Sequence, residues 1–226
     1  MTSYPPSGAG CRPRCTDGVD PPHATLEFWF DFASTYSYLT VPRIEALAEA
    51  ARVRLGWRAF LLGPIFREQG WRDSPFNLYP AKGRYMWRDL ERSCARLELP
   101  YRRPSVFPRN GLLAARVACH HSDATWLPSF VRAVFRANFA KDLDIADPKV
   151  IGECLDEVGE DGKAVIEAAQ SPESKQQLIT RTDAAAQLGI FGAPTFVVAG
   201  ELYWGSDRLA EALTAARSSL PAGAHE

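Results

Sequence analysis

This 226-residue sequence has no marked excess of either positive or negative charge. It also lacks a long uninterrupted hydrophobic run and a regularly spaced set of cysteines. Lysine and arginine (26) nearly balance aspartate and glutamate (27), so no overall field favours nucleic acid or an anionic membrane surface as a partner. The longest candidate for a membrane span, 184–200, is interrupted by Gly189, Gly192 and Pro194. We therefore expect a protein that binds neither nucleic acid nor membrane.

The five cysteines are too scattered for a disulfide framework, and their odd number leaves at least one thiol unpaired within a monomer. This favours a reducing, cytoplasmic location. The N-terminus lacks a basic start followed by an apolar stretch, so no secretory signal is expected. Cys11 and Cys15 have no matching Cys or His pair nearby, and we predict no metal site. The remaining three thiols fall in segments with helical patterns, where buried cysteines behave as small apolar groups: Cys94, Cys119 and Cys154.

The two ends of the chain differ from the rest. Residues 1–24 are rich in Pro, Gly, Ser and Asp without periodicity, which predicts a disordered leader. We expect a flexible tail over 217–226. Between them, a composition with 46% hydrophobic and 23% charged residues is typical of a globular protein with one substantial core.

An aromatic run, 26–30, predicts a buried strand that ends at Asp31. A helical pattern follows from Tyr36 to about residue 51, and 53–60 alternates large apolar with polar residues as a second strand does. Strand, helix and strand form a βαβ unit with parallel strands. The next stretch, 61–80, is punctuated by glycine and proline, which predicts a long loop.

Helical patterns fill the middle of the chain, over residues 81–97, 110–122, 125–140, 148–158 and 171–188. Two short strands, 195–199 and 201–204, are separated by Gly200, which permits a tight hairpin. A last helix is expected to begin near Ser206 or Asp207, either of which could be its N-cap. This order predicts an α/β fold, a thioredoxin-like domain (25–66 and 176–216) with an inserted all-helical domain (67–175).

Ser34 stands at the predicted helix start, and two interpretations of it remain open. The positive end of a helix stabilises an anion, so the hydroxyl could belong to a binding site. Alternatively, Ser34 or Ser37 merely caps the helix. Gly192-Ala193-Pro194-Thr195 precedes a strand, which makes Ala193–Pro194 a candidate cis peptide that would lie beside Ser34 in this fold.

The segment Ser34-Thr35-Tyr36-Ser37 occupies the place where redox members of the fold carry Cys-x-x-Cys. Without either cysteine, the chain cannot perform dithiol exchange at this position. It can instead offer a hydroxyl and a positive helix end to the thiolate of another molecule.

Several motifs together resemble the kappa-class glutathione transferases and 2-hydroxychromene-2-carboxylate isomerases, relatives of DsbA in the thioredoxin superfamily. The motifs lie at 30–39, 60–66, 75–77, 81–86, 192–196 and 204–208. The resemblance covers about 25–215 and favours a functional role for Ser34. The family usually has proline directly after this serine, whereas this chain has Thr35, so loop geometry and substrate preference can differ.

The resemblance implies glutathione as cofactor, with Ser34 donating a hydrogen bond to its thiolate. It implies a glutathione site that comprises Ser34, Thr35, Tyr36, Arg67, Asn77, Ala193, Pro194, Ser206 and Asp207. A solvated loop position is an equal alternative for Arg67. Four aromatic residues could wall a pocket for a small aromatic substrate, although each is by default a packing residue: Phe66, Tyr85, Trp87 and Trp204.

The reaction that the resemblance implies first is isomerisation in aromatic-compound catabolism, through reversible addition of the glutathione thiolate, by a homodimer. Two alternatives stay open, a glutathione transferase or peroxidase and a non-catalytic thioredoxin-like binding module. The Pro-Phe-Asn motif followed by Ala-Lys-Gly-Arg-Tyr-Met favours the isomerase.

Overall fold

The computed structural model describes residues 24–219. The leader expected over 1–24, with Cys11 and Cys15, lies outside these residues except for Ala24, which is the first residue of a strand. Of the tail expected over 217–226, residues 220–226 lie outside the described residues, whereas Arg217 and Ser218 belong to the last helix, with Arg217 in its final turn. A cation there interacts favourably with the helix dipole.

Four strands form one mixed sheet in the order β2-β1-β3-β4. They are β1 (Ala24–Phe30), β2 (Val53–Ala59), β3 (Thr195–Val198) and β4 (Glu201–Trp204). β1 pairs in parallel with β2 and antiparallel with β3, and β3 pairs antiparallel with β4. The predicted βαβ unit and C-terminal hairpin are confirmed. The hairpin turns through Ala199 (φ 49°) and Gly200 (φ 85°), so the glycine stands where a positive φ is needed.

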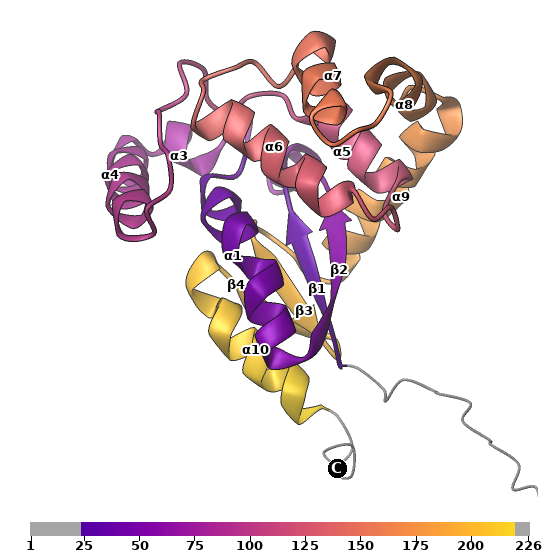
Figure 1. Cartoon of the computed structure of the whole chain (residues 1–226). Helices are drawn as coiled ribbons and strands as arrows, with labels where there is room; N and C mark the ends of the chain where they lie inside the picture. Colours follow the sequence, from indigo (N-terminus) through magenta and orange to yellow (C-terminus); the bar gives the residue numbers. More distant parts are fainter. Residues whose placement is uncertain (1–23, 220–226) are drawn as a thin grey trace, which may run out of the picture.

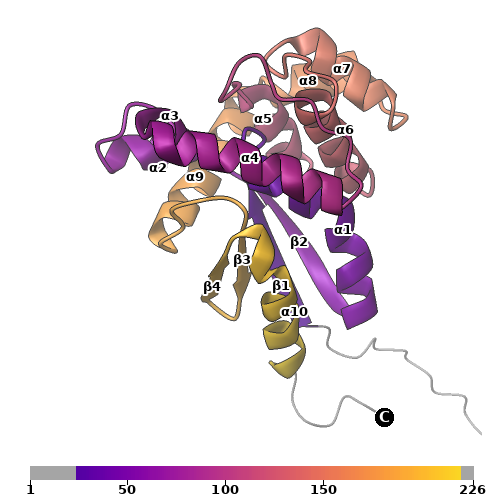
Figure 2. The same cartoon turned by 90° about the vertical axis from the view of Figure 1, so that its left-hand side faces the viewer.

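Helices cover both faces of the sheet (Figures 1 and 2). α1 (Thr35–Ala51) and α10 (Leu209–Ser218) pack together on one face, and α2 (Leu62–Glu68) and α9 (Pro172–Gln187) contribute to a cluster on the other. The helices between are α3 (Pro75–Leu78), α4 (Pro80–Arg96), α5 (Leu112–His120), α6 (Leu127–Phe139), α7 (Pro148–Asp156) and α8 (Gly162–Ala169). This is the expected thioredoxin-like fold with a helical insertion, and α5 to α8 gather at the end of the sheet where α1 begins.

Alternation along β1 divides its side chains between two cores. Leu26, Phe28 and Phe30 enter the large cluster with α1, α10 and the helical insertion. Trp29 points the other way, into a smaller cluster with Ile65 of α2. Both faces of β1 are therefore covered, which explains its unbroken aromatic run.

The prediction of a long loop over 61–80 is wrong, because α2, α3 and the start of α4 lie in this segment. Pro75 and Pro80 occupy the first positions of α3 and α4, where a missing N–H costs nothing. Helix α8 was not predicted. The domain boundaries expected at 66/67 and 175/176 fall inside α2 and α9. Among residues 24–219, no helix is both long and apolar enough to cross a membrane.

Candidate active site

Ser34 is the N-cap of α1, at the point where the central strand gives way to the helix. Its hydroxyl oxygen accepts the N–H of Ser37 at 3.2 Å and donates to the carbonyl oxygen of Ala193 at 2.7 Å. The cap is therefore Ser34 and not Ser37. The other N–H groups of the first turn have no partner within the helix, and the first turn contains no acidic residue. This arrangement suits an anion close to the Ser34 hydroxyl.

The segment that faces Ser34 is the predicted proline motif. The Ala193–Pro194 peptide bond is cis, as expected. Ala193 is buried in the cluster that contains Ile65, and the carbonyl oxygen of Pro194 accepts the N–H of Gly205 at 2.9 Å. The structure thus brings Ser34, Ala193 and Pro194 together from opposite ends of the chain, and it lays α2 against them.

Ser206 and Asp207 follow β4 and reach the side of α1. Arg43 of α1 donates to the carbonyl oxygen of Ser206 at 2.6 Å. The expected helix start is slightly wrong, since Ser206–Arg208 form a short 3-10 helix and α10 begins at Leu209 with Arg208 as its cap. Gly205, at φ 114°, turns the chain out of the strand, and Asp207 is exposed.

Tyr36 joins α1 to the helices that carry Asn77. Its hydroxyl donates to the Asp89 carboxylate at 3.1 Å, and its ring lies 6.4 Å from that of Phe76. Burial raises the pKa of the Tyr36 hydroxyl, and the Asp89 carboxylate raises it further. Tyr36 therefore remains a neutral donor and packs the helices together, while Thr35 is buried as the first residue of α1.

Asn77 lies on α3 and Arg67 on α2. The side chain of Asn77 is hydrogen-bonded, whereas that of Arg67 is exposed to solvent. The Asn77 amide donates to the Asp73 carboxylate and, at 3.0 Å, to the carbonyl oxygen of Phe107. Arg67 is exposed in the last turn of α2. Asn77 also lines a cavity of about 570 Å³ between α4 and the segment after it, and Ser34 is not among its described lining residues. No hydrogen bond among the described residues joins Asn77 to Ser34.

An exposed aromatic pair stands beside the proline motif. The rings of Phe191 and Trp204 are 4.8 Å apart and nearly edge-to-face, with 48% and 54% of their surfaces exposed. Any side chain at Gly192 would collide with the Trp204 indole, 2.3 Å away. Of the other aromatic candidates, Trp87 is buried, whereas Tyr85 is exposed on α4.

Sequence reasoning treated Asp31 only as the end of a strand, but its carboxylate organises the entry to α1. One oxygen accepts the N–H of Ala33 at 2.7 Å, and the other accepts the N–H of Leu62 at 2.8 Å. Burial raises the pKa of this carboxyl, and the two N–H donors oppose that rise. The signal available in the sequence was an acidic residue between a buried strand and a helix start.

The described cysteines are all unpaired and buried, in α4, α5 and α7: Cys94, Cys119 and Cys154. Burial raises the pKa of the Cys94 thiol to about 11, and the same cause raises that of Cys154 to about 11. None is a ready nucleophile at neutral pH. Residues 24–219 also hold no cluster of three or more His, Cys, Asp or Glu side chains that could bind a metal ion.

We expect the protein to reduce insulin no faster than the uncatalysed background, because the helix start has hydroxyls in place of thiols. A turbidity assay with dithiothreitol measures this rate. The double variant Ser34→Cys, Ser37→Cys restores two thiols at the start of α1 and should gain activity. Wild-type turnover that survives replacement of Cys94, Cys119 and Cys154 would contradict the placement of the active site.

Comparisons with known proteins identify the family of the chain. Residues 25–216 match the family described as the DSBA-like thioredoxin domain. A 2-hydroxychromene-2-carboxylate isomerase of Sphingobium xenophagum is 29% identical over 82% of this chain and 94% of its own length. Glutathione S-transferase kappa 1 of Homo sapiens is also 29% identical, over 82% of this chain and 87% of its own.

Among solved structures, a 2-hydroxychromene-2-carboxylate isomerase superposes with a TM-score of 0.74 at 25% identity, covering 84% of this chain and 93% of that one. Sequence and structure thus point to the same relatives. The chain belongs to the DSBA-like thioredoxin-domain family, together with the 2-hydroxychromene-2-carboxylate isomerases and the kappa-class glutathione transferases.

Proposed function

We propose that the protein is a glutathione-dependent isomerase of the 2-hydroxychromene-2-carboxylate type, which acts on a small aromatic substrate. The observation that carries the proposal is a serine, in place of a cysteine, at the N-cap of α1 and in contact with the Ala193 carbonyl. Such a site can stabilise the thiolate of a bound molecule, although it contains no cysteine of its own. The relatives add the reaction class, since the matched proteins are isomerases and glutathione transferases.

The residues present fit a bound thiol peptide at the Ser34 end of the site. Ser34 supplies a hydroxyl donor, α1 its positive end, and the Ala193–Pro194 segment a backbone edge close to both. Asp207 is an exposed carboxylate that can accept from an ammonium group. Asn77 fits less directly, because Asp73 and Phe107 already take its amide donors and leave the amide oxygen to accept.

In this proposal the Ser34 hydroxyl turns its proton from the Ala193 carbonyl to the thiolate sulfur and so lowers the pKa of the thiol. When bound, glutathione supplies the nucleophile that adds reversibly to a conjugated carbon of the substrate, which frees a former double bond to rotate. Phe191 and Trp204 offer aromatic surface for a planar substrate next to the proline motif. Thr35 and Tyr36 provide the free backbone N–H groups at the start of α1 that face the thiolate. Arg67 on α2 is a candidate partner for a glutathione carboxylate. The proposal also includes a homodimer and a reducing, cytoplasmic setting, and the unpaired thiols support the reducing setting.

The test begins with glutathione binding by calorimetry. We then expect glutathione-dependent interconversion of 2-hydroxychromene-2-carboxylate and its open-chain isomer, followed by absorbance. Two results would contradict the proposal. One is isomerisation that proceeds without glutathione, and the other is a protein that binds glutathione but shows no isomerisation.

A glutathione transferase is the second candidate, favoured by the match to the human kappa enzyme. Conjugation of a standard aryl halide at a rate well above that of isomerisation would support it. Absence of glutathione binding at millimolar concentration would support a non-catalytic binding module instead.

A further inference from the structure

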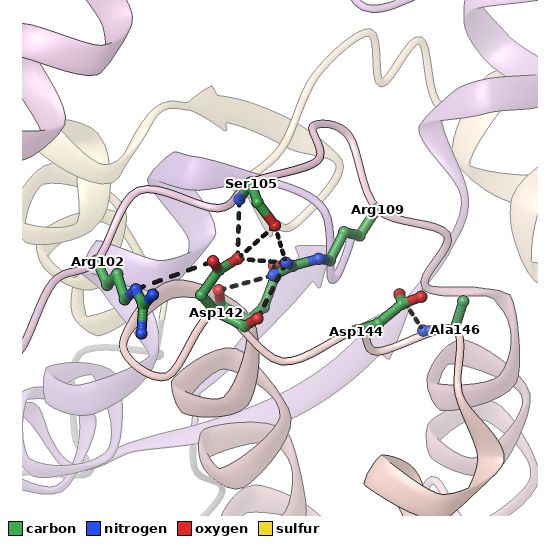
Figure 3. Close-up of polar contacts among 7 residues, drawn as sticks. Arg102, Ser105, Arg109, Asp142, Asp144 and Ala146 are labelled. Carbon is green, nitrogen blue, oxygen red and sulfur yellow. Dashed lines mark hydrogen bonds and ion pairs between the residues drawn. The ribbon is translucent and has the colours of Figure 1, made fainter.

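A polar cluster around the buried Arg109 lies behind the active-site loop, between the helices of the insertion. Arg109, 6% exposed, precedes α5, and its guanidinium donates to the Asp142 carboxylate, to the Asp142 carbonyl oxygen at 3.1 Å and to the Ser105 hydroxyl at 3.1 Å (Figure 3). The N–H of Ser105 and the Arg109 guanidinium hold the pKa of the Asp142 carboxyl down, to about 2. The ion pair therefore persists at any ordinary pH and fixes the Arg109 side chain.

Arg109 in turn fixes the amide of Asn138, which is 1% exposed on α6. One guanidinium nitrogen donates to the Asn138 side-chain oxygen at 3.1 Å and to its carbonyl oxygen at 3.2 Å. A guanidinium can only donate, so the amide oxygen must face it. The amide nitrogen then points the opposite way, where it donates to the carbonyl oxygen of Phe32 at 3.1 Å.

Phe32 belongs to the four-residue loop that ends at Ser34. Within that loop the N–H of Ser34 bonds to the Asp31 carbonyl oxygen, and the Asp31 carboxylate holds Ala33. Asn138 adds a bond from the helical insertion, and the Phe32 ring packs against Phe135 of the same helix at 5.3 Å. The loop is thus clamped from two sides, by its own aspartate and by α6.

We propose that Asn138, oriented by Arg109, is a positioning residue that sets the Ser34 hydroxyl for the bound thiolate. The inference rests on the proposed glutathione function. Without the Asn138 donor the Phe32 carbonyl would be buried and unpaired, and the loop would move to satisfy it. Because Ser34 is two residues further on, that movement displaces the hydroxyl from the end of α1. The helical insertion therefore acts on the chemistry through one side-chain amide.

Asn138→Asp tests this directly. The aspartate can still accept from Arg109, but it cannot donate to Phe32. We expect the pKa of glutathione bound to the variant to rise by about one unit, which is a tenfold smaller thiolate fraction at neutral pH. The binding constant for glutathione should change less than threefold, and kcat should fall in proportion to the thiolate. Thiolate absorbance against pH and steady-state kinetics supply these readouts.

Two further variants keep the test sharp. Gly111→Ala leaves the polar cluster intact but adds a methyl group 2.9 Å from Cβ of Phe32, so it should displace the same loop and raise the thiol pKa. Ser105→Ala is the matched control: it removes one acceptor of Arg109 but keeps the Asp142 ion pair and the bonds to Asn138, so it should leave the thiol pKa unchanged even if stability falls.

An unchanged thiol pKa in Asn138→Asp or in Gly111→Ala, with glutathione bound and the fold intact, overturns the positioning role. If wild-type protein binds glutathione without lowering its thiol pKa, the proposed function fails and this inference fails with it. A lowered pKa in wild type that both loop variants retain leaves the function standing and rejects only the role of Asn138.

Discussion

Replacement of Ser34 by alanine is expected to raise the pKa of the thiol of bound glutathione by one to two units. The lost interaction is a charge-assisted hydrogen bond, worth about 1.5–3 kcal/mol, and about 1.4 kcal/mol corresponds to one pKa unit. The positive end of α1 remains and limits the loss. Affinity for the tripeptide should change much less, because the remaining contacts of the proposed site hold its ends. Titration of thiolate absorbance against pH measures the thiol pKa in wild type and variant, and calorimetry measures the affinity.

Ser37→Ala is the matched control for this experiment. The Ser37 hydroxyl is buried in the same turn and has no hydrogen-bond partner in the structure, whereas its N–H still binds the Ser34 oxygen. Its removal should leave the thiol pKa unchanged. Ser34→Ala also removes a helix cap, which costs about 1 kcal/mol of stability. A loss of stability with an unchanged thiol pKa and retained turnover would show that Ser34 only caps α1.

Ser34→Cys is an informative companion. It places an ionisable thiol at the helix start, where attack on added glutathione disulfide would form a mixed disulfide, release one glutathione thiolate and block the reaction. Reversal of that block by dithiothreitol would locate the glutathione sulfur next to residue 34.

Gly83→Ala is expected to destabilise the fold by about 1–3 kcal/mol, the usual range for overpacking. A Cβ at this position of α4 would lie 2.2 Å from the carbonyl oxygen of Phe76, so α3 and α4 would have to separate. Asn77 is the next residue on α3, and glutathione affinity should fall as well if Asn77 binds it. Urea unfolding and calorimetry measure the two effects.

Gly152→Ala provides the comparison, because it makes the same change inside α7. There the new Cβ meets only the end of the Ile166 side chain, at an ordinary 3.8 Å. Alanine is the better helix former by about 0.8–1 kcal/mol, so this variant should be more stable than wild type. Equal stability of the two variants would mean that α3 yields to the methyl group without cost.

Local patterns were sufficient for the parts of the fold that are built from neighbouring residues. The aromatic run of β1, the cap at Ser34 and the turn at Gly200 each follow from a few adjacent side chains, although Ala199, expected in the strand, belongs to the turn. The segment 61–80 failed because glycine and proline punctuate helix starts as well as loops. Which of these occurs depends on whether the segment finds a surface to pack on, and α2 finds it in the cluster that holds Trp29.

The site shows the same division. The resemblance to the thioredoxin-like fold predicted that Ser34 and Ala193 lie side by side, and the structure confirms this contact. The bond from Asn138 to Phe32 could not be predicted, because it joins residues 106 positions apart and depends on a third, Arg109, for its direction. The glutathione roles of the predicted residues stay predictions.

The position of β1 in the sheet has a consequence for the order of folding. Its two neighbours come from distant parts of the chain, β2 directly after α1 and β3 only at Thr195. During synthesis, β1 therefore keeps one edge unpaired while the whole insertion is being made, and such an edge is a template for pairing with other chains. Ser34 and Ala193 are 159 positions apart, so their contact closes late. A nascent chain that ends within the insertion therefore exposes the unpaired edge of β1, which can pair with other chains, and it lacks the Ala193 side of the active site.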